Sequence, residues 1–141
     1  LWFEDIQKGN IVSVREFDNW LSILKGLPPE ACSQSGRCSM QNIVEANGDI
    51  YPCDFYVLDP CRVANVQDEN FRFFQGILPN MEFFKEGMKR GEACKECKWY
   101  PLCRGGCRRN YTKENKNYFC EAYQEFFEYT IARWEWLAAR L

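Results

Sequence analysis

The sequence contains no histidine. This absence excludes catalytic triads and dyads that use histidine as the general base, and it excludes zinc fingers and haem sites with imidazole ligands. Any catalytic or metal-binding chemistry must therefore rely on thiols and carboxylates. The sequence also lacks an apolar run near the ~20 residues that a membrane-spanning helix needs, so we expect no membrane partner.

A secretion signal is also absent. Residues 1–5 read LWFED and place acids where a signal peptide has positive charge, so we expect a cytoplasmic protein. The start at Leu rather than Met indicates a part of a longer polypeptide. With 46% apolar and 16% aromatic residues, the 141 residues are sufficient for a folded core in one ordinary domain or two small ones.

Hydrophobic periodicity predicts two helices. Apolar residues at i, i+3, i+4 and i+7 predict a helix over residues 14–25, with Ser13 and Glu16 as a capping box and Gly26 as its end. The same spacing predicts a long helix over residues 120–141. We expect the aromatic residues of both helices to form a core rather than an electron relay or a base-stacking surface.

A β-hairpin is predicted between the first cysteines. Asn47-Gly48 joins two short apolar segments, which is a strong signal for a tight turn. We expect this hairpin to bring Cys38 and Cys53 toward one another.

The segment after the hairpin is less regular. Within residues 54–93 we expect short helices at 71–75 and 81–89. Residues 94–109 are dense in cysteine, and we expect loops and single helical turns there, shaped by a bound centre.

Nine cysteines are the most distinctive feature of the sequence. Eight of them follow the spacings C-x5-C-x14-C and C-x2-C-x5-C-x3-C-x12-C, and Cys61 lies between these runs. The odd count and the absence of an export signal disfavour a disulfide framework. Sulfur ligands in fours suit both zinc and iron–sulfur clusters, but only Cys94 and Cys97 form a C-x2-C pair, so the spacing favours iron–sulfur and leaves zinc as the alternative.

Positive charge is concentrated around the second run of cysteines. Residues 89–116 contain nine bases and three acids, although the net charge of the chain is −2. Nearby cations stabilise thiolates and reduced clusters, whereas the alternative is a solvated or nucleic-acid-binding face. The acidic balance of the whole chain argues against a dedicated nucleic-acid binder, and we expect no nucleic-acid partner.

Three segments resemble the C-terminal SPASM domain of anaerobic sulfatase-maturating enzymes, which belong to the radical SAM superfamily. They are NGDIYPCDFY at 47–56, CKECKWYPLCRGGCRR at 94–109 and YFCEAYQEFF at 118–127. The resemblance covers nearly the whole chain. The residues YPCDFY point to the sulfatase-maturating branch.

The resemblance implies a small α+β fold. A cysteine-ligated, twitch-like β-hairpin half is combined with a helical half that ends in a long C-terminal helix. Residues 1–30 would be a helical connector from a radical SAM barrel, 31–93 the hairpin half with the first auxiliary cluster, and 94–141 the cysteine-dense half with the second.

Two auxiliary [4Fe–4S] clusters are also implied, with interleaved ligands. By motif position the first set of ligands is Cys32, Cys38, Cys53 and Cys107, and the second set is Cys94, Cys97, Cys103 and Cys120. Complete ligation by cysteine favours electron transfer over substrate coordination. We expect Cys61 to be a small, half-buried apolar residue, with a role as a spare ligand as the alternative.

The activity that the resemblance implies is conversion of an active-site Cys or Ser of a sulfatase polypeptide to formylglycine. A 5′-deoxyadenosyl radical would take a hydrogen, Asp54 would take a proton and the auxiliary clusters would receive an electron. The alternative for Asp54 is a turn residue that accepts backbone hydrogen bonds.

S-adenosylmethionine and a third [4Fe–4S] cluster would belong to the N-terminal barrel of the same polypeptide. The chain has no C-x3-C-x2-C triplet, so we expect it to be inactive alone. The alternatives are a SPASM domain of another radical SAM peptide-modifying enzyme and a non-enzymatic four-cysteine zinc module that binds other macromolecules.

Overall fold

The computed structural model describes residues 1–68 and 81–140. The chain forms two compact units. Unit 1 contains residues 1–36 and 90–141, so it is built from both ends of the chain, and unit 2 contains residues 37–89. The division into 1–30, 31–93 and 94–141 stays a prediction.

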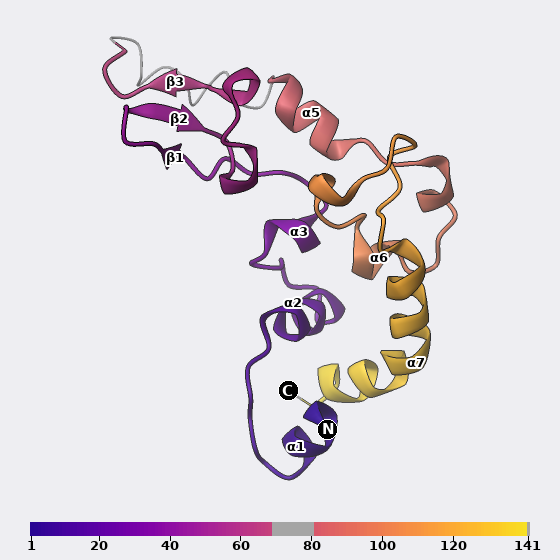
Figure 1. The fold of residues 1–141 in the computed structure, drawn as a ribbon. Coiled ribbons are helices and arrows are strands. Elements are labelled where there is room, and N and C mark those ends of the chain that lie inside the picture. Colours follow the sequence, from indigo (N-terminus) through magenta and orange to yellow (C-terminus); the bar gives the residue numbers. More distant parts are fainter. Residues whose placement is uncertain (69–80, 141) are drawn as a thin grey trace. The chain divides into compact units, whose positions relative to one another are not determined.

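Unit 1 is helical (Figure 1). Its α-helices are α1 (Trp2–Gln7), α2 (Arg15–Leu24), α3 (Cys32–Ser35), α6 (Tyr100–Cys103) and α7 (Cys120–Ala138), and its 3-10 helices are η5 (Glu92–Cys94) and η6 (Arg108–Asn110). The long C-terminal helix and the short turns of the cysteine-dense segment are therefore confirmed. The helix α1 was not predicted, because six residues are too few for a periodic pattern.

The core of unit 1 is aromatic. Trp20 of α2, Leu102 of α6, and Phe127 and Trp134 of α7 are its buried members. The rings of Trp20 and Phe127 meet edge to face with their centroids 5.1 Å apart. The prediction that the periodic aromatic residues form a core is confirmed.

The predicted start of α2 is wrong in one respect. Val14 is the N-cap and no side chain caps the helix, so Ser13 and Glu16 do not form a capping box. The helix begins one residue later than the pattern predicts, so Ser13 lies before the N-cap position, and its hydroxyl donates a hydrogen bond to the Asp18 carboxylate. The predicted end is confirmed, since Gly26 follows the helix in a left-handed conformation.

Unit 2 contains a small antiparallel sheet in the order β1-β2-β3. Its elements are β1 (Ile43–Val44), β2 (Asp49–Tyr51), η1 (Asp54–Tyr56), η2 (Asp59–Cys61), β3 (Ala64–Asn65) and α5 (Glu82–Met88). The helix predicted at 81–89 is confirmed as α5, and the one predicted at 71–75 lies outside the described residues. The strand β3 was not predicted.

The predicted hairpin is confirmed, with β1 and β2 paired so that Val44 faces Ile50. The Gly48 N–H donates to the Glu45 carbonyl over 2.8 Å, and Glu45 N–H donates to the Asp49 carbonyl over 2.9 Å. Gly48 has a φ of 84°, which a residue with a Cβ rarely adopts. The hairpin therefore closes with a longer, glycine-terminated loop rather than a two-residue turn.

The predicted α+β class is confirmed, because the described residues form this sheet in unit 2 and α-helices in both units. Among the described residues, no helix combines the length and the apolar character that a membrane crossing requires.

Candidate metal centre

All nine cysteines are half-buried thiols, and none is joined in a disulfide. The four cysteines of the second set lie together in unit 1. The first set is divided between the units: Cys32 and Cys107 belong to unit 1, and Cys38 and Cys53 to unit 2.

Short helical turns position the second set. Cys94 ends η5, Cys103 ends α6 and Cys120 begins α7. The turn that contains Cys97 is closed by a hydrogen bond of 3.0 Å from Tyr100 N–H to the Cys97 carbonyl. The buried side chain of Leu102 anchors α6 in the core, so the core holds the Cys103 backbone in place.

Electrostatic interactions connect the four thiols of the second set. Burial raises the pKa of the Cys94 thiol, and negative charge on Cys120 and Cys97 raises it further. Burial also raises the pKa of Cys103, with smaller contributions from Cys120, Cys94 and Cys97. Four thiolates placed this close repel one another, and a bound metal centre would relieve that repulsion.

The loop between Cys103 and Cys107 requires glycine. A Cβ on Gly105, which has a φ of 87°, would lie 2.3 Å from Arg90 Nε. Arg90 is held there because its guanidinium donates to the carbonyls of Arg104 and Gly36, over 3.1 and 2.7 Å. The Gly105 N–H donates to Cys103 Sγ over 3.3 Å, so this loop also supplies a hydrogen bond to one thiol of the second set.

Asn117 supports the same loop from inside the unit. Its buried amide donates to the Gly105 carbonyl over 2.9 Å, and its oxygen accepts the Phe119 N–H over 2.8 Å. The second hydrogen bond lies next to Cys120. One side chain therefore links the glycine loop to the start of α7.

Gln124 is a polar neighbour of the second set that the sequence interpretation missed. Its Nε2 lies 3.5 Å from Cys120 Sγ and 3.9 Å from Cys97 Sγ. The two side chains on α7 are four residues apart, and this helical spacing is the signal that would have predicted the contact. A surface hollow of about 430 Å³ lies beside them, lined by Ala93, Cys97, Lys98, Trp99, Gln124, Glu125 and Glu128.

Two cysteines of the first set, Cys32 and Cys107, lie in unit 1 beside the starts of short helices. Cys32 begins α3, and Asn19 fixes this start by accepting the Ala31 N–H over 2.8 Å. Cys107 precedes η6. Burial raises the pKa of the Tyr123 phenol, and so does negative charge on Cys103, Glu16 and Cys107, which indicates that Tyr123 lies near one cysteine of each set.

In unit 2 the hairpin leads into Cys53 and Asp54. The pairing of the strands continues with a hydrogen bond of 2.9 Å from Gln41 N–H to the Pro52 carbonyl. Asp54 is exposed at the start of η1, and no side chain caps this helix. The Cys53 thiol lies 3.3 Å from Asp54 Oδ1 and donates to it. Cys61 is half-buried at the end of η2.

The donor chemistry of the second set fits an iron–sulfur cluster. Within residues 1–68 and 81–140, no group of three or more cysteine or acidic side chains converges as the ligands of a single ion do. A [4Fe–4S] cluster takes one thiolate at each of four irons, so its ligands need not converge on one point. Four mutually interacting thiols with N–H donors on three of the sulfurs suit such a cluster.

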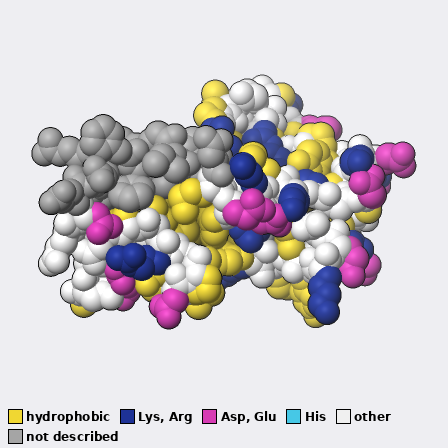
Figure 2. Space-filling view, turned by 90° about the horizontal axis from the view of Figure 1, so that it is seen from above, with side chains coloured by type: hydrophobic (Ala, Val, Ile, Leu, Met, Phe, Trp, Pro, Cys, Tyr) yellow, Lys and Arg dark blue, Asp and Glu magenta, His cyan; other side chains and the backbone are white. Residues whose placement is uncertain are grey.

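The basic residues around the second set are partly neutralised. Lys95 pairs with Glu92, Lys98 with Glu128, and Lys116 with Glu121. On the face that Figure 2 shows, Lys and Arg side chains lie among Asp and Glu side chains. These exposed pairs contribute little stability.

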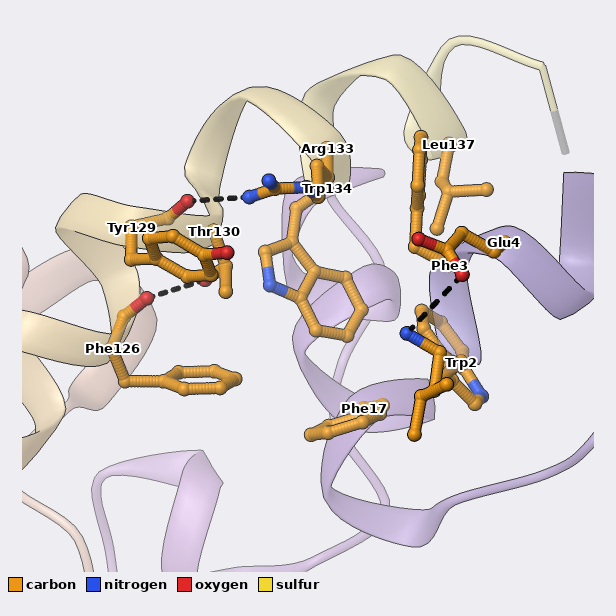
Figure 3. Close-up of a pocket in the computed structure, with 11 residues that line it drawn as sticks. Trp2, Phe3, Glu4, Phe17, Phe126, Tyr129, Thr130, Arg133, Trp134 and Leu137 are labelled. Atoms are coloured by element: carbon orange, nitrogen blue, oxygen red, sulfur yellow. Dashed lines mark hydrogen bonds and ion pairs between the residues drawn. The ribbon is translucent and has the colours of Figure 1, made fainter.

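A second hollow lies between α1 and α7 (Figure 3). Its volume is about 210 Å³, and most of its lining is apolar or aromatic, including Trp2, Phe17 and Trp134. Two charged side chains border it, Glu4 and Arg133, and the Arg133 guanidinium donates to the Tyr129 carbonyl over 2.7 Å. No thiol lines this hollow, so it is separate from the cysteine chemistry.

Sequence comparison gives several anaerobic sulfatase-maturating enzymes among the relatives of this chain. No family model matches the chain. The cysteine-type anaerobic sulfatase-maturating enzyme of Clostridium perfringens (strain 13 / Type A) is 45% identical over 94% of this chain, which spans 37% of that enzyme. The enzyme of the same name from Clostridium novyi (strain NT) is 40% identical over 100% of this chain and 39% of its own length. The serine-type enzyme of Bacteroides thetaiotaomicron is 23% identical over 91% of this chain and 33% of its own length.

Solved structures give the same result. The structure of anSMEcpe with bound AdoMet and the Kp18Cys peptide superposes with a TM-score of 0.90 and 43% identity, over 99% of this chain and 40% of that one. The anSMEcpe structure with AdoMet and the Cp18Cys peptide gives the same values. The chain therefore spans about two fifths of the length of these relatives, and the predicted fold is confirmed over almost its whole extent.

Proposed function

Because the chain belongs to the anaerobic sulfatase-maturating enzymes and corresponds to their C-terminal region, we propose that it is an auxiliary-cluster (SPASM) domain that binds two [4Fe–4S] clusters. The observation that carries the proposal is the gathering of four thiols in unit 1, three of which receive an N–H contact from Gly105 or Gln124. Such an all-sulfur set, with N–H donors on three of its sulfurs, is the environment in which iron–sulfur clusters are held.

The proposed ligands are the two sets that the family resemblance implies. Cys32, Cys38, Cys53 and Cys107 would hold the first cluster, and Cys94, Cys97, Cys103 and Cys120 the second. When bound, the clusters supply one-electron acceptors. The glycine loop and Asn117 hold the segment that contributes a ligand to each cluster, Cys103 to the second and Cys107 to the first.

The complete enzyme would act on a sulfatase polypeptide and use AdoMet. In the proposed reaction Asp54 would take a proton from the substrate side chain, AdoMet would supply the radical that takes a hydrogen atom, and an auxiliary cluster would supply the acceptor for one electron. Together these losses would amount to a two-electron oxidation of the substrate. The greater identity to cysteine-type than to serine-type relatives supports a cysteine residue as the substrate.

Asp54 has the geometry for a base that acts after cluster assembly. Its carboxylate is exposed and accepts a hydrogen bond from the Cys53 thiol. Ligation removes the proton of Cys53, so this donor disappears. The Asp54 carboxylate is then available to accept a proton from a substrate.

The test is turnover by the complete enzyme with a cysteine-containing sulfatase peptide, AdoMet and a reductant. We expect Asp54→Asn to lower kcat by a factor of about 10²–10⁴, the usual contribution of a general base, with the iron content unchanged. Asp59→Asn is the matched control, because Asp59 is also exposed at the start of a 3-10 helix in unit 2. Near-normal turnover by Asp54→Asn would rule out the base role, and a wild-type enzyme that does not oxidise the peptide would rule out the proposed activity.

A further inference from the structure

We propose that Gln124 raises the reduction potential of the second cluster by donating hydrogen bonds to two of its thiolate ligands, Cys97 and Cys120. This inference rests on the proposed function, because it needs a cluster in the second set. It assigns a positioning and tuning role to a residue that is not itself a ligand.

The contact depends on the architecture of α7. Cys120 is the first residue of this helix, and Gln124 lies one turn further along the same face. Cys97 comes from a different segment and approaches the same amide. Gln124 Nε2 therefore lies 3.5 Å from one sulfur and 3.9 Å from the other.

The chemistry of a primary amide matches two thiolates. The side-chain NH2 group of glutamine has two N–H donors, and a metal-bound thiolate has only acceptor capacity. If the amide were turned over, its oxygen would face two negative sulfurs, which is repulsive. Ligation of Cys97 and Cys120 thus fixes the amide with its nitrogen toward the cluster.

Hydrogen bonds to ligand sulfurs change the potential of an iron–sulfur cluster. Reduction adds negative charge, and an N–H donor stabilises the more negative state, so each such bond raises the potential. Gly105 makes a similar bond to Cys103, but this donor belongs to the backbone and no side-chain substitution removes it. Gln124 is the side-chain donor of this site that substitution can remove.

The charged residues near Gln124 do not replace its hydrogen bonds to the two sulfurs. Gln124 and Cys97 both line the surface hollow of about 430 Å³, which also contains Lys98, Glu125 and Glu128. Lys98 is paired with Glu128 across this hollow. The charge of Lys98 is therefore partly neutralised, whereas Gln124 is a neutral donor within 3.5 Å of Cys120 Sγ and 3.9 Å of Cys97 Sγ.

The test is an anaerobic redox titration of the reconstituted chain, followed by EPR, for the wild type and for Gln124→Leu. We expect the leucine variant to retain all its iron and to reduce the second cluster with an equilibrium constant about tenfold lower, equivalent to 59 mV for one electron. The potential of the first cluster should not change.

Two further variants separate hydrogen bonding from packing. Gln124→Lys keeps donors on a long side chain, so its second-cluster potential should be at least that of the wild type. Gln7→Leu makes the same change at an exposed residue of α1, away from the cysteines, and should leave both potentials unchanged.

The outcomes distinguish the two proposals. If both clusters assemble in the wild type and Gln124→Leu has the wild-type potentials, the role of Gln124 is refuted and the proposed function stands. A fall in potential that Gln124→Lys shares equally would also refute hydrogen bonding as its cause. If the wild type shows no iron–sulfur signal after reconstitution, the proposed function itself is refuted.

Discussion

Gly105 illustrates how much of the site depends on single residues. Its N–H reaches Cys103, its carbonyl accepts from Asn117, and its missing Cβ leaves room for the Arg90 guanidinium. A Cβ at this position would collide with Arg90. The first glycine of the segment CRGGC therefore has a steric explanation in addition to its conformational one.

We predict that Gly105→Ala destabilises unit 1 more than Gly26→Ala does. Both glycines are left-handed, with φ of 87° and 74°, so both changes carry a conformational cost of about 1 kcal/mol. Nothing lies within 4 Å of a Cβ at Gly26, whereas Arg90 Nε lies 2.3 Å from one at Gly105. Urea unfolding followed by tryptophan fluorescence should show a further loss of about 1–3 kcal/mol for Gly105→Ala. Equal losses would show that Arg90 moves away without cost.

At the residue scale the cysteine spacing predicted a metal centre and the family resemblance added Asp54 as a candidate base, but neither predicted the polar residues that surround the thiols. Asn117 and Arg90 act on the backbone of segments distant in sequence, and no local pattern encodes such contacts. Gln124 differs, because its spacing from Cys120 on a predicted helix was sufficient to suggest a contact.

Among the elements, α7 contributes most to the packing of unit 1. Phe127 is completely buried, where its ring stacks on Tyr123 and meets Trp20 edge to face. Tyr129, two residues further on, is 73% exposed. The helix therefore has one face in the core and another in solvent.

We predict that Phe127→Ala lowers the free energy of unfolding of unit 1 by about 3–5 kcal/mol, because it leaves a large cavity in the aromatic core. Tyr129→Ala on the same helix should change it by no more than about 0.5 kcal/mol. Thermal or urea unfolding measures both. Similar effects of the two substitutions would contradict the packing of α7 against α2.

The sheet of unit 2 has its own acid sensitivity. A hydrogen bond from Asn65 lowers the pKa of the Asp49 carboxyl below its usual value, and a hydrogen bond from Arg62 makes the next largest contribution in the same direction. Asn65 Nδ2 lies 2.9 Å from Asp49 Oδ1, and Arg62 forms an ion pair with the same carboxylate. Because the folded pKa is depressed, this stabilisation is present above about pH 4 and is lost as the pH falls through the folded value.

We predict that Asp49→Asn removes part of this acid sensitivity. The amide protection factor of Val66, which donates to the Gly48 carbonyl, should fall in the wild type as the pH is lowered from about 5 to about 3. In Asp49→Asn the decrease should be smaller. Identical pH profiles would mean that the carboxylate is not coupled to the sheet.

Long or strongly marked elements were predictable from the sequence, and short ones were not. Nineteen residues of amphipathic pattern identify α7, and Asn47-Gly48 identifies the hairpin. The strand β3 has two residues, Ala64 and Asn65, so its existence depends on pairing with β2 rather than on local propensity. The failed capping box of α2 shows the same limit, since the helix starts one residue later than the pattern indicates and Val14, not Ser13, occupies the N-cap position.

For the whole molecule, the important fact is that unit 1 joins both ends of the chain. Trp2 of α1 lies 5.0 Å from Trp134 of α7, measured between ring centroids. Contacts between residues so far apart in the sequence depend on the tertiary fold. Periodicity within one segment predicts that a helix has a buried face, but it does not predict which segment covers that face. The aromatic content of the sequence predicted that a core exists, and the structure identifies its partners.

The central claim is that the eight cysteines of the two sets bind two iron–sulfur clusters. Its most direct test is the content of iron and acid-labile sulfide per chain after anaerobic reconstitution, for the wild type and for the double variant Cys94→Ser/Cys97→Ser. Two [4Fe–4S] clusters require about eight iron and eight sulfide in the wild type, and loss of the second alone leaves about four of each. A colourless wild-type protein that takes up about two zinc ions and no sulfide under the same conditions would contradict the account and favour a structural zinc module.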